Sequence, residues 1–77
     1  MERIFKLLKN KEDFKSVIIT TENAQIYMHL NKRYFEPQKT YNISIDYYNG
    51  TRTRKLDQTK KQIENILKDF KIINITQ

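Results

Sequence analysis

The chain has 77 residues, of which 38% are hydrophobic and 31% are charged, and its formal net charge is +6 at pH 7. This length suffices for one domain, residues 1–77, with a small core, because folding such a short chain buries only roughly 60% of its unfolded surface. The composition is typical of folded globular proteins and is too apolar for a disordered chain.

Several classes of protein are excluded or disfavoured by what the sequence lacks. Without cysteine the chain cannot form disulfides or use thiolate metal ligands. The longest apolar runs, residues 17–19 and 72–73, are far shorter than the roughly 20 residues that span a membrane, and residues 1–6 do not resemble a signal peptide. We therefore expect a cytoplasmic protein. The abundance of Ile, Lys and Asn suggests an AT-rich gene, such as one from a phage, a plasmid or a low-GC bacterium.

The first half of the chain favours strands. Residues 4–8 fit either one face of a helix or the alternation of a strand, and we expect a strand. Residues 15–21 contain a β-branched run that favours a strand, and residues 26–31 alternate between apolar and polar side chains. A turn over residues 21–23 separates these two segments, so the sequence predicts a hairpin.

The middle of the chain contains a loop and a second hairpin. The only proline, Pro37, places residues 32–40 in a loop. Residues 41–48 alternate as a strand does, and residues 51–56 form the returning strand. Between them Asn49 and Gly50 favour a two-residue type I′ turn, because both central residues of that turn need a positive φ.

The last third predicts one helix and a short apolar tail. Over residues 57–70, Ile63, Ile66, Leu67 and Phe70 follow helical spacing. Thr59 and Gln62 are placed as a capping box, with Asp57 as a competing N-cap. Residues 72–75 form either a last strand or a packing segment. We expect an α+β fold: a small, largely antiparallel sheet of four to five strands, as an open sheet or an OB/SH3-like barrel, with one C-terminal amphipathic helix.

Catalysis and cofactor binding have little support in the sequence. A phosphate-binding loop needs several glycines, and Gly50 is the only one. The Cys and His sets of zinc sites are absent, and the single histidine, His29, lies opposite the apolar positions of its strand. We therefore expect no catalytic residues, no metal and no cofactor, and a protein that is not an enzyme.

The densest positive charge lies within residues 50–61, where Asp57 is the only acidic residue. With a two-residue loop, Arg52 and Arg54 share a face with Tyr47 and Ile45, whereas a one-residue bulge moves both arginines to the opposite face. The same strand residues also fit a core bordered by arginine stems, with no ligand at all. The cations are Arg52, Arg54, Lys55, Lys60 and Lys61.

A binding function follows from this charge. Cations neutralise phosphates and aromatic rings stack on bases, so we expect nucleic acid, DNA or RNA, to bind at the cationic hairpin. The alternative is a phage- or mobile-element-encoded inhibitor, of the kind that anti-CRISPR proteins exemplify, which binds a host nucleic-acid-handling protein or defence complex. Its basic hairpin would dock on an acidic surface of that partner or fill its nucleic-acid channel. A homodimer formed through exposed strands is a third interpretation. The aromatic and basic residues assigned to the site besides the five cations are Tyr47, Lys32, Arg33, Tyr34 and Phe35.

Overall fold

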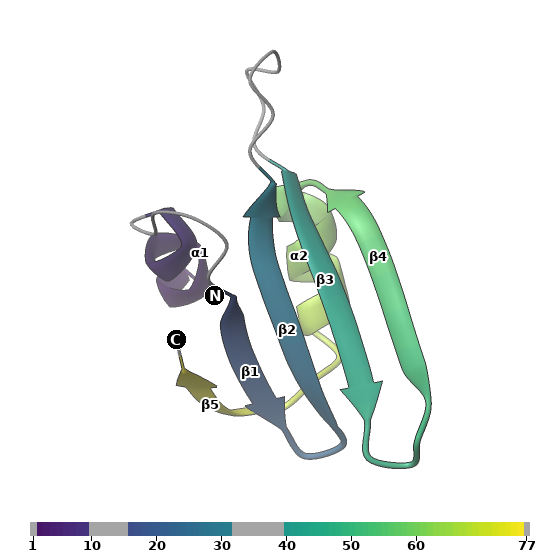
Figure 1. The fold of residues 1–77 in the computed structure, drawn as a ribbon. Coiled ribbons are helices and arrows are strands. Elements are labelled where there is room, and N and C mark those ends of the chain that lie inside the picture. The colour runs from purple at the N-terminus through teal and green to yellow at the C-terminus, as the bar shows by residue number, and fades with distance from the viewer. Residues whose placement is uncertain (1, 10–15, 32–39, 77) are drawn as a thin grey trace.

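The computed structural model describes residues 2–9, 16–31 and 40–76. These residues form two helices and five strands, which Figure 1 labels in chain order. The elements are α1 (Glu2–Lys9), β1 (Val17–Thr21), β2 (Ala24–Asn31), β3 (Thr40–Tyr47), β4 (Arg52–Gln58), α2 (Lys60–Leu67) and β5 (Ile72–Thr76).

The five strands form one antiparallel sheet in the order β4-β3-β2-β1-β5. The strands β1 and β2 pair as one hairpin and β3 and β4 as another, with Val17 opposite Met28 in the first and Ile45 opposite Thr53 in the second. The strands β4 and β5 lie at opposite edges (Figure 1). The sheet is therefore open, which corrects the OB/SH3-like barrel that was one of the two expected forms.

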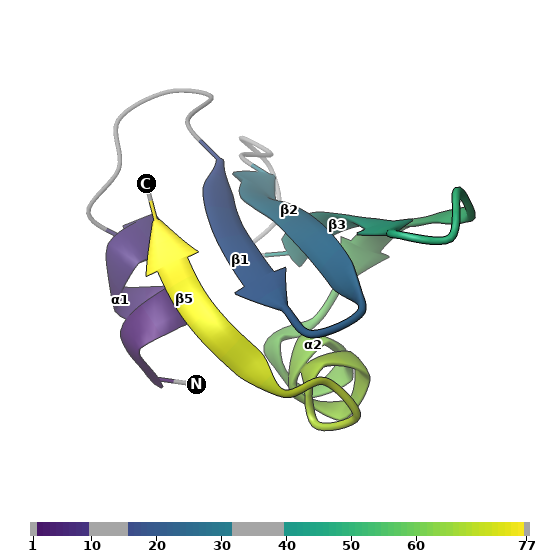
Figure 2. The same cartoon turned by 90° about the horizontal axis from the view of Figure 1, so that it is seen from below.

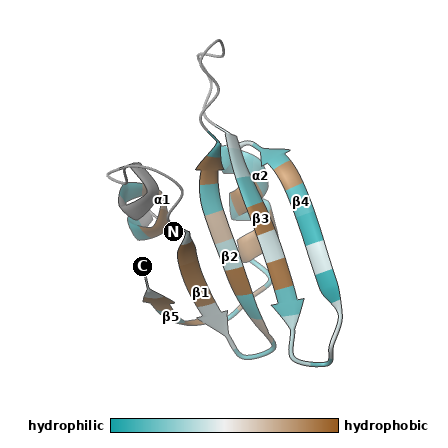
Figure 3. Ribbon diagram, in the orientation of Figure 1, coloured by the Kyte–Doolittle hydropathy of each residue, from teal (hydrophilic) through white to brown (hydrophobic). Residues whose placement is uncertain are grey.

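Both helices lie on the same side of the sheet, and the β3–β4 hairpin extends beyond α2 (Figure 2). Hydropathy alternates along β2 and β3, while β4 is mostly hydrophilic (Figure 3). The apolar residues of this alternation point toward the helices and form the core, whereas the opposite face of the sheet carries polar side chains. Fully buried core residues include Ile4, Val17, Ile19, Ile26, Met28, Ile43, Ile63 and Leu67.

The segment that was expected to be a strand at residues 4–8 is helical, as part of α1. In a strand the adjacent Ile4 and Phe5 would point to opposite faces. Here their exposed fractions are only 0% and 7%, while Arg3 and Lys6 on either side are exposed. The Phe5 ring packs edge-on against Tyr41 of β3, with ring centroids 5.3 Å apart. Packing of one helical face against the sheet thus decides the structure of this short segment.

The second helix begins where the capping box was predicted. Thr59 is the N-cap, its hydroxyl accepts from the backbone N–H of Gln62, and the Gln62 side chain accepts from the backbone N–H of Thr59. The competing cap Asp57 belongs to β4 instead. The helix is not C-terminal, because β5 follows it and pairs with β1, so the apolar tail is a strand. No helix in residues 2–9, 16–31 and 40–76 is long and apolar enough to cross a membrane.

The turns of the two hairpins are joined to each other. Tyr48 donates its backbone N–H to the Asn23 carbonyl at 3.0 Å and its hydroxyl to the Thr21 carbonyl at 3.3 Å. The buried Thr21 hydroxyl in turn donates to the Ala24 carbonyl at 2.8 Å and accepts from the Ala24 N–H at 3.0 Å. These bonds fix the turn of the β3–β4 hairpin, which carries the candidate site.

Candidate functional site

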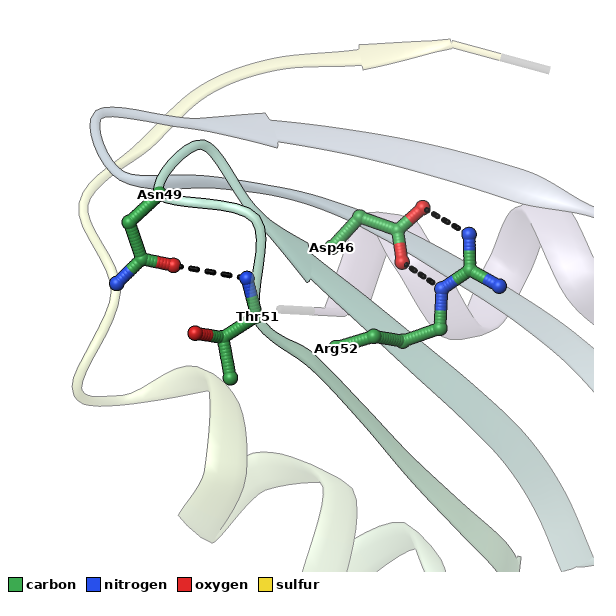
Figure 4. Close-up of polar contacts among 4 residues, drawn as sticks. All are labelled: Asp46, Asn49, Thr51 and Arg52. Atoms are coloured by element: carbon green, nitrogen blue, oxygen red, sulfur yellow. Dashed lines mark hydrogen bonds and ion pairs between the residues drawn. The ribbon is translucent and has the colours of Figure 1, made fainter.

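The loop of the β3–β4 hairpin has three residues and not the two that were predicted. Tyr47 donates its N–H to the Thr51 carbonyl at 2.8 Å, and Gly50 donates its N–H to the Tyr47 carbonyl at 3.0 Å. Gly50 has a φ of 93°, whereas Asn49 does not have a positive φ. The Asn49 side-chain oxygen instead accepts from the Thr51 N–H at 2.9 Å (Figure 4). This geometry is a turn followed by a glycine bulge, the usual three-residue hairpin loop.

The longer loop decides which face carries the arginines. Asp46 lies opposite Arg52 and Ser44 lies opposite Arg54, so both arginines share the face of these polar residues. The placement beside Tyr47 and Ile45, which a two-residue loop requires, is therefore wrong, and the bulged alternative is correct. The physical reason is that one additional loop residue exchanges the two faces of the returning strand as far as Lys55, beyond which the register shifts again.

Arg52 and Arg54 line a hollow of about 580 Å³ on the face of the sheet that the helices leave uncovered. We call this surface the open face. Strands β2 and β3 contribute to the same hollow with side chains that alternate away from the core. Its main lining residues are Tyr27 and His29 from β2, Ser44 and Asp46 from β3, and Arg52, Arg54 and Leu56 from β4.

The two arginines of the open face differ in their partners. Arg52 donates from Nε to Asp46 Oδ1 at 2.6 Å and from Nη2 to Asp46 Oδ2 at 3.4 Å (Figure 4). This pair is largely exposed and contributes at most about 1 kcal/mol to stability, but it holds the Arg52 guanidinium over the sheet. Arg54 is exposed and makes no hydrogen bond or ion pair with the described residues. Among the described residues, it is the cation of this face without such a partner.

A network of side-chain amides determines the tautomer of His29. The backbone N–H of Asp57 donates to Asn42 Oδ1 at 3.0 Å, which orients the Asn42 amide. Asn42 Nδ2 then lies 3.1 Å from His29 Nε2 and must donate to it. Asn31 completes the network by exchanging two hydrogen bonds with Asn42, at 2.6 and 2.8 Å. The neutral His29 ring therefore carries its proton on Nδ1.

Among the predicted site residues that the structure describes, Tyr47, Lys55, Lys60 and Lys61 do not join Arg52 and Arg54. Tyr47 and Lys55 lie on the side of the sheet that faces the helices. The Lys60 Nζ lies 5.0 Å from the centroid of the Phe5 ring, in a cation–π contact between the two helices. Lys61 is exposed on α2. Lys32, Arg33, Tyr34 and Phe35 lie outside the described residues.

A second hollow, of about 570 Å³, lies between the helix-facing side of the hairpin and α2. The rings of Tyr47 and Phe70 pack at a centroid distance of 6.1 Å in this hollow. Among the described residues that line this hollow, Lys55 is the only cation. We call this surface the helix-side hollow.

Tyr27 and His29 of the open face were not among the site residues predicted from the sequence. The signal was present, because both alternate away from Ile26 and Met28 in β2. Placing them beside the arginines also required the correct hairpin register. The expected two-residue loop would have put Arg52 and Arg54 on the opposite face of the sheet.

The described residues contain no group of three or more His, Asp or Glu side chains that could hold a metal ion. No protein-family model matches the sequence, and no curated protein or solved structure matches it significantly.

Proposed function

We propose that this protein binds single-stranded nucleic acid on the open face of its sheet. The observation that carries the proposal is that Arg52 and Arg54 line one hollow together with Tyr27 and His29. This surface differs from the cationic hairpin predicted from the sequence, because Tyr47 and Lys55 are replaced by residues of β2.

The chemistry of the open face suits a strand whose bases are unpaired. Cationic side chains neutralise phosphates, and aromatic rings stack on exposed bases for about 1–3 kcal/mol per base. Tyr27 and His29 are half-buried, so their rings are held on the sheet and lose little freedom on binding. Bases in a duplex are already stacked and would not reach these rings. A net charge of +6 adds long-range attraction for any polyanion.

The polar groups of the face have separate roles. Arg54 contacts phosphate, because it has no partner among the described residues, while Arg52 is oriented by Asp46. The Nδ1–H of His29 is a donor that can bond to a base or a phosphate oxygen, since Nε2 is already occupied by Asn42.

Fluorescence anisotropy with labelled single-stranded and duplex DNA and RNA, at two salt concentrations, tests the proposal. We expect single strands to bind more tightly and affinity to fall with salt. Arg54→Gln should lower the slope of log affinity against log salt by about 0.7, the loss of one phosphate contact. Tyr27→Ala should weaken binding by about 1–3 kcal/mol.

Lys55→Gln is the matched control for Arg54→Gln, because the two residues are neighbours in β4 and point to opposite faces. Both variants remove one exposed charge, so they lower non-specific attraction equally. If Lys55→Gln weakened binding as much as Arg54→Gln, the open face would not be the site. Affinity that does not depend on salt would contradict nucleic-acid binding altogether.

A further inference from the structure

The strand β4 forms an edge of the sheet between the two hollows. Its seven residues pair with β3 along one side. Along its other side it pairs with no strand in residues 2–9, 16–31 and 40–76 (Figure 1). An edge of this kind presents backbone donors and acceptors to which another extended chain can bind.

The hairpin register shows which backbone groups face outward. The bond from Tyr47 N–H to the Thr51 carbonyl makes these two residues a hydrogen-bonded pair. Such pairs alternate along antiparallel strands, so Thr53, opposite Ile45, bonds to β3 in the same way. The N–H and C=O groups of Arg52 and Arg54 consequently point away from β3, toward the free side of the edge.

The side chains of β4 alternate between the two hollows. Arg52 and Arg54 line the hollow of the open face, and Thr53 and Lys55 line the helix-side hollow. Because side chains in an added strand lie beside those of its neighbour, alternate residues of that strand would enter the same two hollows. Backbone pairing and two recognition surfaces thus coincide at one edge.

Charge identifies the kind of strand that fits. Arg52, Arg54 and Lys55 are exposed cations on both sides of the edge, and opposite charges in cross-strand pairs are favourable. A second copy of β4 in antiparallel pairing would instead bring its cations near those of the first. We propose that the edge of β4 binds an extended acidic segment of another protein as an added strand. This goes beyond nucleic-acid binding, because it requires the backbone of β4.

The register also predicts the residues of the added strand. In antiparallel pairing, acidic residues lie opposite Arg52, Arg54 and Lys55, and a threonine lies opposite Thr53. Leu56 is 57% exposed on the open face, so an apolar residue fits opposite it. Read from its N-terminus, the matching segment is Val-Glu-Glu-Thr-Glu, and an acetylated and amidated peptide of this sequence is the probe.

An NMR titration of the ¹⁵N-labelled full chain with this peptide tests the proposal. We expect saturable shifts centred on the backbone amides of Arg52 and Arg54. A peptide N-methylated at the glutamates opposite these two residues keeps its charge and loses its inward N–H groups, so it should not bind. Equal binding of the N-methylated peptide, or the absence of saturable shifts, would overturn the proposal.

One pair of variants separates backbone pairing from charge. Arg54→Gln and Arg54→Pro remove the same charge, but only the proline removes the outward N–H, and proline is tolerated on the free side of an edge strand. We expect the proline variant to lose peptide binding and the glutamine variant only to weaken it, with folding checked by circular dichroism. Equal weakening by both would contradict strand addition.

Lys55→Glu distinguishes this proposal from the proposed nucleic-acid function. This variant should abolish binding of the peptide. It should leave in place the part of oligonucleotide binding that depends on Tyr27 and His29, because Lys55 lines the helix-side hollow and not the open face. Peptide binding that survives Lys55→Glu would overturn the added-strand register. Self-association of the chain that shifts the Arg52 and Arg54 amides without peptide would instead identify a second copy as the occupant.

Discussion

The two faces of the sheet are built from the same strands and differ in burial. In β2, Ile26 is fully buried against the helices, while its neighbour Tyr27 is half-buried on the open face. In β3, Ile45 is 3% exposed, while Asp46 holds Arg52 over the sheet. Adjacent positions thus divide between the buried core and the face on which we propose binding, so a pair of neighbouring substitutions can test that proposal.

The largest effect is expected from removing core volume beneath the sheet. Ile26→Ala should lower the free energy of unfolding by about 2–5 kcal/mol, because it deletes buried atoms and leaves a cavity. In a chain this small that loss can unfold the protein, so Ile26→Val, expected to cost about 0.5–1.5 kcal/mol, is the graded variant. Urea denaturation followed by circular dichroism measures both.

Tyr27→Ala is the matched substitution on the open face. It should cost about 1 kcal/mol or less in stability, because its side chain is only half-buried, and should instead weaken oligonucleotide binding. If Tyr27→Ala destabilised the protein as much as Ile26→Ala, the division between the two faces would be wrong.

Alternation in sequence predicted the two faces of β2 and β3 well, because apolar residues repeat there at every second position. It did not predict which face β4 presents, since Arg52, Arg54 and Lys55 are all hydrophilic and no apolar pattern specifies their register. The loop alone decides it. Asn49-Gly50 favours a two-residue type I′ turn, but the same pair also fits a three-residue loop with a glycine bulge, which the structure adopts.

The N-terminal segment shows a different limit of sequence analysis. Ile4 and Phe5 suit a helix or a strand, and eight residues are too few for intrinsic propensity to decide. Contact with Tyr41 across the core settles the choice, and that contact joins distant parts of the chain.

The glycine bulge that assigns the arginines to the open face provides the next prediction. Gly50→Ala should lower stability by about 1–2 kcal/mol, because a φ of 93° is unfavourable for a residue with a Cβ. No atom lies within 4 Å of the added Cβ, so the cost arises from the backbone alone. Thermal unfolding measures it.

Gly50→Asn is the control, since asparagine tolerates a positive φ better than alanine and should cost less. Equal losses for the two variants would show that backbone conformation at this position is not the cause. An unchanged stability of Gly50→Ala would contradict the three-residue loop, and with it the placement of Arg52 and Arg54 on the open face.

The smallest effect is expected on the covered face at alkaline pH. Burial raises the pKa of the Tyr41 phenol above its usual value, and the nearby Lys60 charge offsets part of this increase. A phenol whose pKa is raised in the folded state contributes stability that is complete below the unfolded pKa of about 10 and is lost as the pH rises toward the folded value. Tyr41→Phe should therefore make the urea midpoint less sensitive to an increase from about pH 9 to about pH 11, the range around that unfolded pKa. The open-face variant Tyr27→Phe is the control. If it reduced the pH dependence of the urea midpoint as much as Tyr41→Phe does, burial on the covered face would not be the cause.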